Sequence, residues 1–478
     1  MATKSKSKPH TIRDLLFRVA ILSIFIFSVV FFTDHKGWFD PDNTNNHAAR
    51  KWDSYYQFTR TNNVDIVLIG NSHIYTGINP KNLSCALNAN TFILAAPGTT
   101  ITDAYYCLKE AITLSKPKIA VIETFAIKDY RSHDFTEGPL SDQLQSFQAR
   151  KNVRQKLCAT PVLFTSKHYL AAWSNTIRNH SYLLKDREQI ERNIFMKRQI
   201  RRPQGLYLGR FVTDNTGMTD TTLRKYDIPG AASVVEGSEY AIGKEAIRAV
   251  EKIVSLCRKN DIQPIFLTIP MYYRHINDYD VWKERLEEAL APHQPVWFDL
   301  QSPFDYEAFI PECFENSVRA NQHLSYQGSL VSTYKLAHFI HETFPALLPD
   351  RSLENKWHKL FYGEEGYFQN HPPSPSDPSV TILLRDKVIS NLTLKEVSLF
   401  PGSEFLLMYI KIDKQDFPNS RGNVLILTVD MEFEGQQITT QIEAEGTHLY
   451  DPINHALFFS YLNKGVTIRG IREVEILQ

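Results

Sequence analysis

The sequence predicts an α/β domain in which helices cover both faces of a parallel sheet, followed by a β-sandwich and preceded by a membrane helix. Between residues 65 and 344, short apolar runs alternate with helical patterns, which is typical of a doubly wound sheet. After residue 378 the apolar runs become β-rich and are separated by Asn, Pro and Gly turns. At 478 residues the chain is too long for one compact core, which agrees with several domains.

The amino-terminal segment has the composition of a membrane anchor. A basic tail, residues 1–14, precedes an apolar segment, residues 15–33. Its strictly uncharged run is shorter than the roughly 20 residues that span a bilayer, but residues 15–17 extend it and Arg18 can reach the interface. No small-residue cleavage site follows Phe32, so an uncleaved signal anchor is favoured over a cleaved signal peptide. The positive-inside rule then predicts a single-pass protein of the cell membrane, with the bulk of the chain periplasmic or otherwise extracytoplasmic.

The α/β domain is expected over residues 50–345. Continuous apolar runs, rather than alternating ones, predict strands buried on both faces of a parallel sheet, at 65–69, 91–96, 118–123, 264–269 and 295–300. Apolar residues at helical spacing predict helices at 102–115, 243–260 and 326–344, and a Thr or Asp caps the first of these. The connections between the parallel strands are expected to be right-handed.

Three further segments complete the predicted organisation. Residues 128–242 are polar and too long for a simple crossover, so they are expected to form a largely helical insertion that shapes or covers the site. Within it the basic run 192–202 is either a solvated helix face or a contact with an anionic substrate or lipid headgroup. Residues 346–377 have the composition of a linker. Residues 378–478 are expected to form the β-sandwich, with strands in runs such as 379–386, 404–413, 423–433, 436–445 and 466–477.

The charge and cysteine content exclude several classes of function. Lysine plus arginine and aspartate plus glutamate balance at 53 each, and no basic patch is interleaved with aromatic residues, so nucleic acid is not an expected partner. The five cysteines are scattered, without a CxxC pair or a Cys/His cluster at metal-ligand spacing. We therefore expect no metal and no cofactor.

The first predicted strand ends in Gly70-Asn71-Ser72-His73, and this stretch suggests a nucleophile. Ligands of open α/β sheets bind at the carboxyl ends of the strands, where Ser72 is expected. Gly70 is expected to let the chain turn sharply there. A serine hydroxyl needs a general base, and His323, between the last predicted strand and the final helix, is the candidate. The adjacent His73 is expected to be a hydrogen-bonding neighbour or a participant, but not the base.

Three sequence blocks in register resemble the SGNH/GDSL hydrolase superfamily, particularly its membrane-anchored group related to bacterial polysaccharide O-acetylation (alginate acetyltransferase-like) proteins. They are GNSH at 70–73, Gly98 in AAPGTT, and HLSYQG at 323–328. The resemblance spans roughly residues 60–345, apart from the insertion. It implies a three-layer α/β/α flavodoxin-like fold, Ser72 as the nucleophile, His323 as the general base, and the backbone N–H groups of Ser72 and Gly98 as oxyanion donors.

Two positions depart from the family pattern. The third block usually supplies an asparagine, whereas here Thr124 stands in that region as a weaker oxyanion candidate. The family's aspartate three residues before the histidine is Ala320. Asn321 or a main-chain carbonyl could orient His323 instead, and two acids after the fifth strand, Asp299 and Asp305, could also reach it.

The resemblance implies a serine esterase or O-acyltransferase that acts on acyl groups, with acetyl expected, of a cell-envelope polysaccharide through an acyl-enzyme. A transferase would also require an integral-membrane partner that donates the acyl group. Arg274, Tyr272 and, more weakly, His73 are candidate substrate contacts, and a surface role is the favoured alternative for Arg274. Tyr75 and Tyr273, with Tyr272, form either a sugar platform or simple packing. The alternative from another class is a protein that keeps the fold without catalysis, and that binds glycans or assists envelope assembly.

Overall fold

The computed structural model describes residues 12–40, 47–127, 138–195, 208–209, 217–239, 242–318, 323–349, 381–401, 405–413, 424–433, 435–446, 455–463 and 466–477. The predicted linker and Asn321 therefore lie mainly or wholly outside the described residues. The chain divides into two compact units, one formed by residues 1–45 and 164–199 and the other by residues 46–163 and 200–478.

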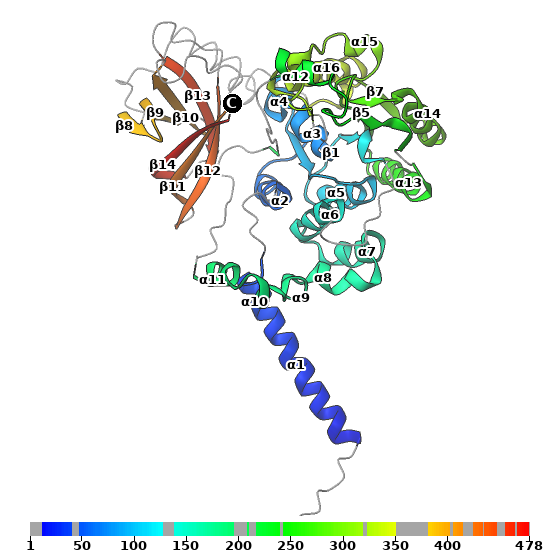
Figure 1. Cartoon of the computed structure of the whole chain (residues 1–478), viewed down its shortest axis with the longest axis vertical. Coiled ribbons are helices and arrows are strands. Elements are labelled where there is room, and N and C mark those ends of the chain that lie inside the picture. Colours follow the sequence, from blue (N-terminus) through cyan, green and yellow to red (C-terminus); the bar gives the residue numbers. More distant parts are fainter. Residues whose placement is uncertain are drawn as a thin grey trace, which may run out of the picture. The chain divides into compact units, whose positions relative to one another are not determined.

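A five-stranded parallel sheet forms the centre of the α/β part, as predicted (Figure 1). Its order is β2-β1-β3-β5-β7, which is the flavodoxin order with the switch point between β1 and β3. The strands are β1 (Ile66–Gly70), β2 (Thr91–Ala95), β3 (Ile119–Glu123), β5 (Gln263–Thr268) and β7 (Val296–Asp299). Each begins within one residue of its predicted start, and β1, β2 and β3 are buried along their whole length, as continuous apolar runs predict.

Alternate residues of these strands pack into two separate cores, so the domain has three layers. Val67, Ile69 and Phe92 belong to the core of one face, and Ile66, Leu68 and Ile93 belong to that of the other. The first face is covered by α2 (His47–Phe58), α5 (Ile101–Leu114), α13 (Lys244–Lys259) and α14 (Tyr279–Leu290). The second is covered by α3 (Ser72–Gly77), α4 (Pro80–Leu87) and α16 (Tyr326–Thr343).

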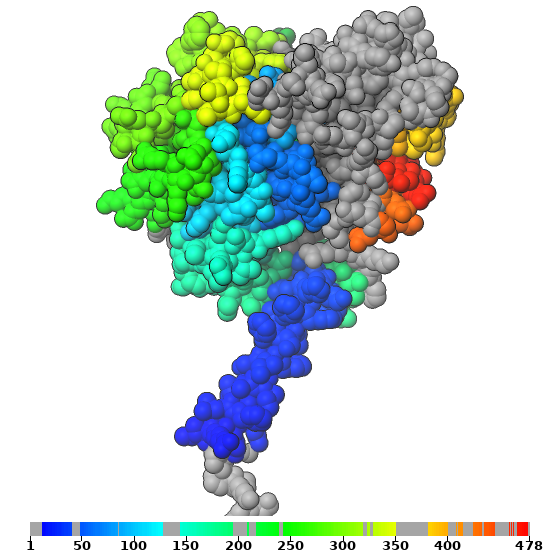
Figure 2. All heavy atoms as spheres, turned by 180° about the vertical axis from the view of Figure 1, so that it is seen from behind, coloured from blue at the N-terminus to red at the C-terminus, as the bar shows by residue number. Residues whose placement is uncertain are grey.

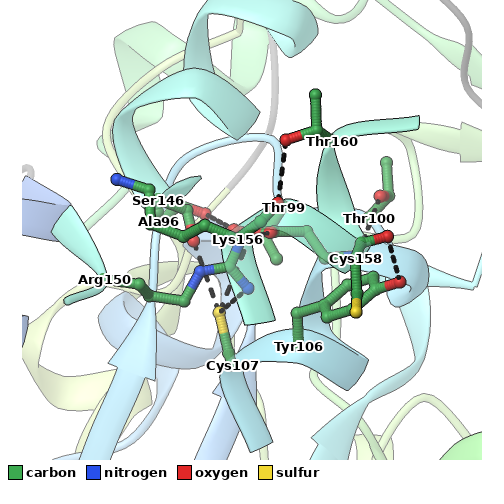
Figure 3. A network of polar contacts seen from close by, with 11 residues as sticks. Ala96, Thr99, Thr100, Tyr106, Cys107, Ser146, Arg150, Lys156, Cys158 and Thr160 are labelled. Carbon is green, nitrogen blue, oxygen red and sulfur yellow. Dashed lines mark hydrogen bonds and ion pairs between the residues drawn. The ribbon is translucent and has the colours of Figure 1, made fainter. Parts of the chain in front are cut away.

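The described parts of the predicted insertion are mainly helical and contact three different parts of the chain, one of which is the unit that contains α1. Helices α6 (Gly138–Ala149) and α7 (Val153–Leu163) contact α2 and α5. A buried ion pair between Arg150 and Asp103, at 2.8 Å, ties the end of α6 to α5, beside Cys107 and Ser146 (Figure 3). Residues 217–218 and 233–236 instead form backbone hydrogen bonds with the segments that carry the candidate site.

The first unit contains α1 (Ile12–Lys36) together with α8 (Tyr169–Trp173), α9 (Asn175–Asn179), α10 (Tyr182–Lys185) and α11 (Arg187–Phe195). Among the described helices, α1 is long and apolar enough to cross a membrane. Its apolar side chains are exposed around the helix, which suits a lipid environment rather than a protein core (Figure 2).

The carboxyl-terminal part is an antiparallel β-sandwich with its own core, as predicted. Its hydrogen-bonded order is β14-β11-β12-β13-β10-β9-β8, in which β12 and β13 share only two residue pairs. The strands are β8 (Thr381–Ile389), β9 (Leu392–Pro401), β10 (Phe405–Asp413), β11 (Val424–Phe433), β12 (Gln436–Gly446), β13 (His455–Asn463) and β14 (Thr467–Leu477).

Candidate active site

Ser72 is the first residue of α3, directly beyond the carboxyl end of β1. The Asn71 side chain caps this helix by accepting a hydrogen bond from the His73 backbone N–H at 2.9 Å. Ser72 and His73 are each 5% exposed, so both side chains lie deep at the strand end. A short strand, a capped turn and a helix thus hold Ser72 at the switch point of the sheet.

Gly70 is required here for a different reason from the expected sharp turn. It continues β1, pairing with Ala95, and its φ is not in the positive range. A Cβ at this position would lie 2.4 Å from the Cβ of Glu123 on β3. Gly70 therefore permits the close approach of β1 and β3 at their carboxyl ends.

His323 is paired with a carboxylate that the sequence did not suggest. Its Nδ1 lies 2.9 Å from Oε2 of Glu315. An ionised carboxylate only accepts hydrogen bonds, so the proton of the neutral imidazole resides on Nδ1 and Nε2 is left as the basic atom. Nε2 is buried and has no hydrogen-bond partner among the described residues, so it is not hydrogen-bonded to the Ser72 hydroxyl in this structure. Catalytic hydrogen bonds of this kind often form only when the substrate is bound.

Backbone pairing places Glu315 opposite His323. The Glu315 N–H donates to the His323 carbonyl at 2.8 Å, and Phe314 forms an antiparallel bridge with Leu324. Gly217, from the insertion, bridges Glu315 on its other side. These short pairings form the scaffold of the base and its acid without a regular strand.

The residues after His323 explain the spacing of the HLSYQG block. Ser325 caps α16 by accepting from the Gly328 N–H at 3.3 Å, and its hydroxyl donates to the Glu312 carbonyl at 2.7 Å. A Cβ at Gly328 would lie 1.9 Å from the Cys313 carbonyl oxygen. The glycine thus allows the first turn of α16 to press against residues 312–313, which keeps His323 in register with Glu315.

Two more histidines lie beside His323. The ring centroid of His73 is 5.4 Å from that of His323, so the neighbour of Ser72 contacts the base. His275, in the loop after β5, is fully buried, and neither of its ring nitrogens has a hydrogen-bond partner among the described residues. Burial, followed by the electrostatic effect of His323, lowers the pKa of His275 to about 4, so this imidazole is neutral at pH 7.

The oxyanion candidates lie beyond neighbouring strands. Gly98 follows β2 in a turn with φ of 60°, a conformation that favours glycine. Thr124 follows β3, but it is fully buried and its hydroxyl lies 2.7 Å from that of Thr268. Glu123, beside it, accepts hydrogen bonds from the Phe125 and Ala126 N–H groups and so caps the short helix after β3.

The predicted substrate contacts and alternative acids have other partners. Arg274 donates to Asp227 at 2.7 Å, and Tyr272 packs against Tyr226 and Phe314 in a buried aromatic cluster. Tyr75 is buried beneath the Lys51 ammonium, whereas Tyr273 is 60% exposed. Asp299 accepts from the Tyr279 hydroxyl at 2.9 Å and Asp305 from Lys335 at 2.9 Å, so Glu315 occupies the position that these acids were considered for.

Sequence reasoning missed Glu315 and His275. The only signal for Glu315 was its position between the fifth strand and HLSYQG, and a search for an acid three residues before His323 passes over it. His275 stands in an unpatterned loop. Within the described ranges, no three His, Cys, Asp or Glu side chains are grouped so that they could hold a metal ion.

Comparisons with known proteins give little further information. No protein-family model matches the chain, and no curated protein matches it. Among solved structures, one match is a two-domain esterase (CEX) active on acetylated mannans, co-crystallised with mannopentaose. The match has a TM-score of 0.27 and 8% sequence identity, and it covers 87% of this chain and 93% of that one. A likeness at this level establishes neither a shared fold nor a shared activity.

Proposed function

We propose that the protein is a serine esterase or O-acyltransferase that acts on small acyl esters, with Ser72 as nucleophile, His323 as general base and Glu315 as the acid that orients the base. The observation that carries this proposal is the Glu315–His323 pair, which leaves Nε2 as the acceptor beside α3. An acid in this position answers one of the two sequence-based arguments for a degenerate site, the loss of the family's aspartate at Ala320. The missing third-block asparagine is the other.

In the proposed reaction, Nε2 of His323 removes the Ser72 hydroxyl proton as Oγ attacks the ester carbonyl carbon. The tetrahedral oxyanion forms near the backbone N–H groups of Ser72 and Gly98. Its collapse breaks the bond to the alcohol oxygen, which leaves with the proton from His323. Water, or a second hydroxyl in a transferase, then attacks the acyl-Ser72 ester by the same route.

The substrate class rests on two considerations. Ser72 is 95% buried, which favours a small acyl group such as acetyl over a long chain. The resemblance to polysaccharide O-acetylation proteins supplies the expectation of a cell-envelope glycan. Tyr273, exposed next to the buried Tyr272, is the candidate for contact with a sugar ring.

The proposal predicts that a fluorophosphonate probe labels the wild type, and that Ser72→Ala abolishes both labelling and hydrolysis of p-nitrophenyl acetate. Removing a triad nucleophile lowers the turnover rate by about 10³-fold or more. The control is Ser166→Ala, a substitution at an exposed serine. A folded wild type that is neither labelled nor active would refute the enzyme and leave the glycan-binding alternative.

The same assay can show whether water or a sugar hydroxyl accepts the acyl group from Ser72. For a transferase, adding an unacetylated glycan to the acyl-enzyme should yield acetylated glycan and accelerate release of the acyl group. For an esterase, free acetate should be the product at every glycan concentration. Mass spectrometry of the products distinguishes the two.

A further inference from the structure

The short helices α8 to α11 are attached to one particular end of α1. Figure 1 shows them around the carboxyl-terminal end of that helix. Asp34 accepts hydrogen bonds from the Thr176 N–H and hydroxyl, each at 2.7 Å, and the Thr176 hydroxyl lies 2.8 Å from that of Thr33. These contacts occur where the uncharged run of α1 ends.

The chain leaving α1 is held by the same helices. Asn179 donates to the Phe39 carbonyl at 2.8 Å, and Asn193, on α11, donates to the carbonyls of Trp38 and Asp40 at 3.0 and 2.8 Å. Trp38 packs edge-on against Phe32. Aromatic residues directly beyond an apolar span are typical of the membrane–water interface. Helices α9 and α11 therefore lie at the level where α1 would leave a bilayer.

These helices expose large apolar side chains at that level. Leu170, Trp173 and Ile177 follow one another at intervals of three and four residues across α8 and α9, and Leu170 is 70% exposed. Leu184 on α10 is 92% exposed, with Leu183 beside it. In water, the exposure of Leu170, Leu183 and Leu184 on such short helices would be unfavourable.

The polar residues of the segment fit a lipid headgroup region. Residues 164–195 contain five lysines and arginines against three aspartates and glutamates. On α11, Arg187 pairs with Glu191 at 3.1 Å and Arg192 with Glu188 at 3.8 Å, while Ile190 is buried. Apolar residues on one side, with basic residues in excess on the other, characterise helices that lie in a membrane interface.

From these observations we infer that α8 to α11 form an interfacial platform, which lies in the outer headgroup layer of the bilayer that α1 is predicted to cross. The occupant of its apolar surface is lipid. The attachment at Thr33, Asp34 and Phe39 to Asp40 sets the depth, and Leu170, Leu183 and Leu184 reach toward the acyl chains. This inference does not depend on the proposed enzymatic activity.

The test uses the full chain in lipid nanodiscs with an environment-sensitive fluorophore, NBD, attached to Leu184→Cys. The background carries Cys85→Ser and Cys158→Ser, because Cys158 is exposed and the other described cysteines are buried. Nitroxide-labelled lipids with the quencher just below the headgroup should remove about half of the NBD emission, because interfacial helices insert about 5–10 Å.

The matched control is Phe304→Cys, an 83% exposed apolar position on α15 (Pro303–Tyr306) in the other unit. Its label should stay unquenched and should emit at the wavelength seen in water. Equal, weak quenching at both positions would overturn the proposal. A blue-shifted but unquenched label at Leu184 would also overturn it, because a protein surface would then cover the platform. Unchanged melting of both variants in detergent excludes misfolding.

Discussion

The two sides of the candidate site are built in different ways. Ser72 is positioned by a strand, a capped turn and a helix that follow one another directly in the sequence. His323 is positioned by short backbone pairings among residues 217, 314–315 and 323–324, which contain no regular strand. Of these segments, residue 217 lies 98 residues before Glu315 in the sequence. A nucleophile on regular elements tolerates changes elsewhere, whereas the base and its acid depend on one another's backbone.

Replacing Glu315 by glutamine tests this comparison most strongly. The amide can donate as well as accept, so it no longer enforces the proton on Nδ1, and we expect kcat/KM to fall by about 10²- to 10⁴-fold. The assay is hydrolysis of p-nitrophenyl acetate, alongside the melting temperature. The control, Glu307→Gln, changes an exposed glutamate and should leave both unchanged. A lower melting temperature with an unaltered rate would make Glu315 a structural residue only.

The buried His275 should make folding stability sensitive to acid. Its pKa in the folded protein, about 4, lies below that of an unfolded histidine, about 6.5, so the unfolded state binds more protons between these values. Stability should therefore fall as the pH drops through this window, by roughly 3 kcal/mol in all, and His275 should contribute no pH dependence above it. Denaturant unfolding measures this loss.

The variant His275→Asn isolates the contribution of this histidine. Its free energy of unfolding should fall less between pH 7 and pH 4 than that of the wild type, whatever its value at pH 7. Equal slopes in the two proteins would show that the pKa of His275 does not differ between the folded and unfolded states.

Two glycine substitutions test the nucleophile side and the base side of the site separately, with smaller expected effects. Gly70→Ala and Gly328→Ala each force a contact well inside van der Waals distance, and overpacking of this kind costs about 1–3 kcal/mol of stability. We expect Gly328→Ala to lower activity beyond its effect on stability, because Cys313 and Ser325 position the Glu315–His323 pair.

Gly470→Ala is the matched control, since a Cβ there meets no atom within 4 Å. Urea unfolding and esterase rates should be measured on all three variants at one temperature. For each variant, the loss of esterase rate is compared with the loss of unfolding free energy. If this ratio is the same for Gly70→Ala and Gly328→Ala, the two sides of the site do not differ in the proposed way.

This difference also accounts for what the sequence could predict. The five strands and the helices at 102–115, 243–260 and 326–344 were predicted correctly because continuous apolar runs and apolar residues at helical spacing are both local properties of the sequence. The cap of the first of these helices is Thr100, just outside the predicted Thr or Asp. Glu315 and His275 were missed because their roles depend on pairings between segments, which leave no periodic pattern. The sequence analysis also gave the wrong reason for Gly70, a sharp turn. The actual reason is its close approach to Glu123, which lies on another strand and so leaves no local signal.

The contact between Gly70 and Glu123 restricts which substitutions homologous sequences can carry. An added Cβ at residue 70 meets the Cβ of residue 123, so shortening Glu123 to alanine would not relieve it. Only glycine at 123 would make room, and it would remove the carboxylate that accepts the Phe125 and Ala126 N–H groups. We therefore expect that no tolerated second substitution can compensate for a side chain at position 70. In an alignment of homologues, it should be invariant wherever residue 123 has a side chain.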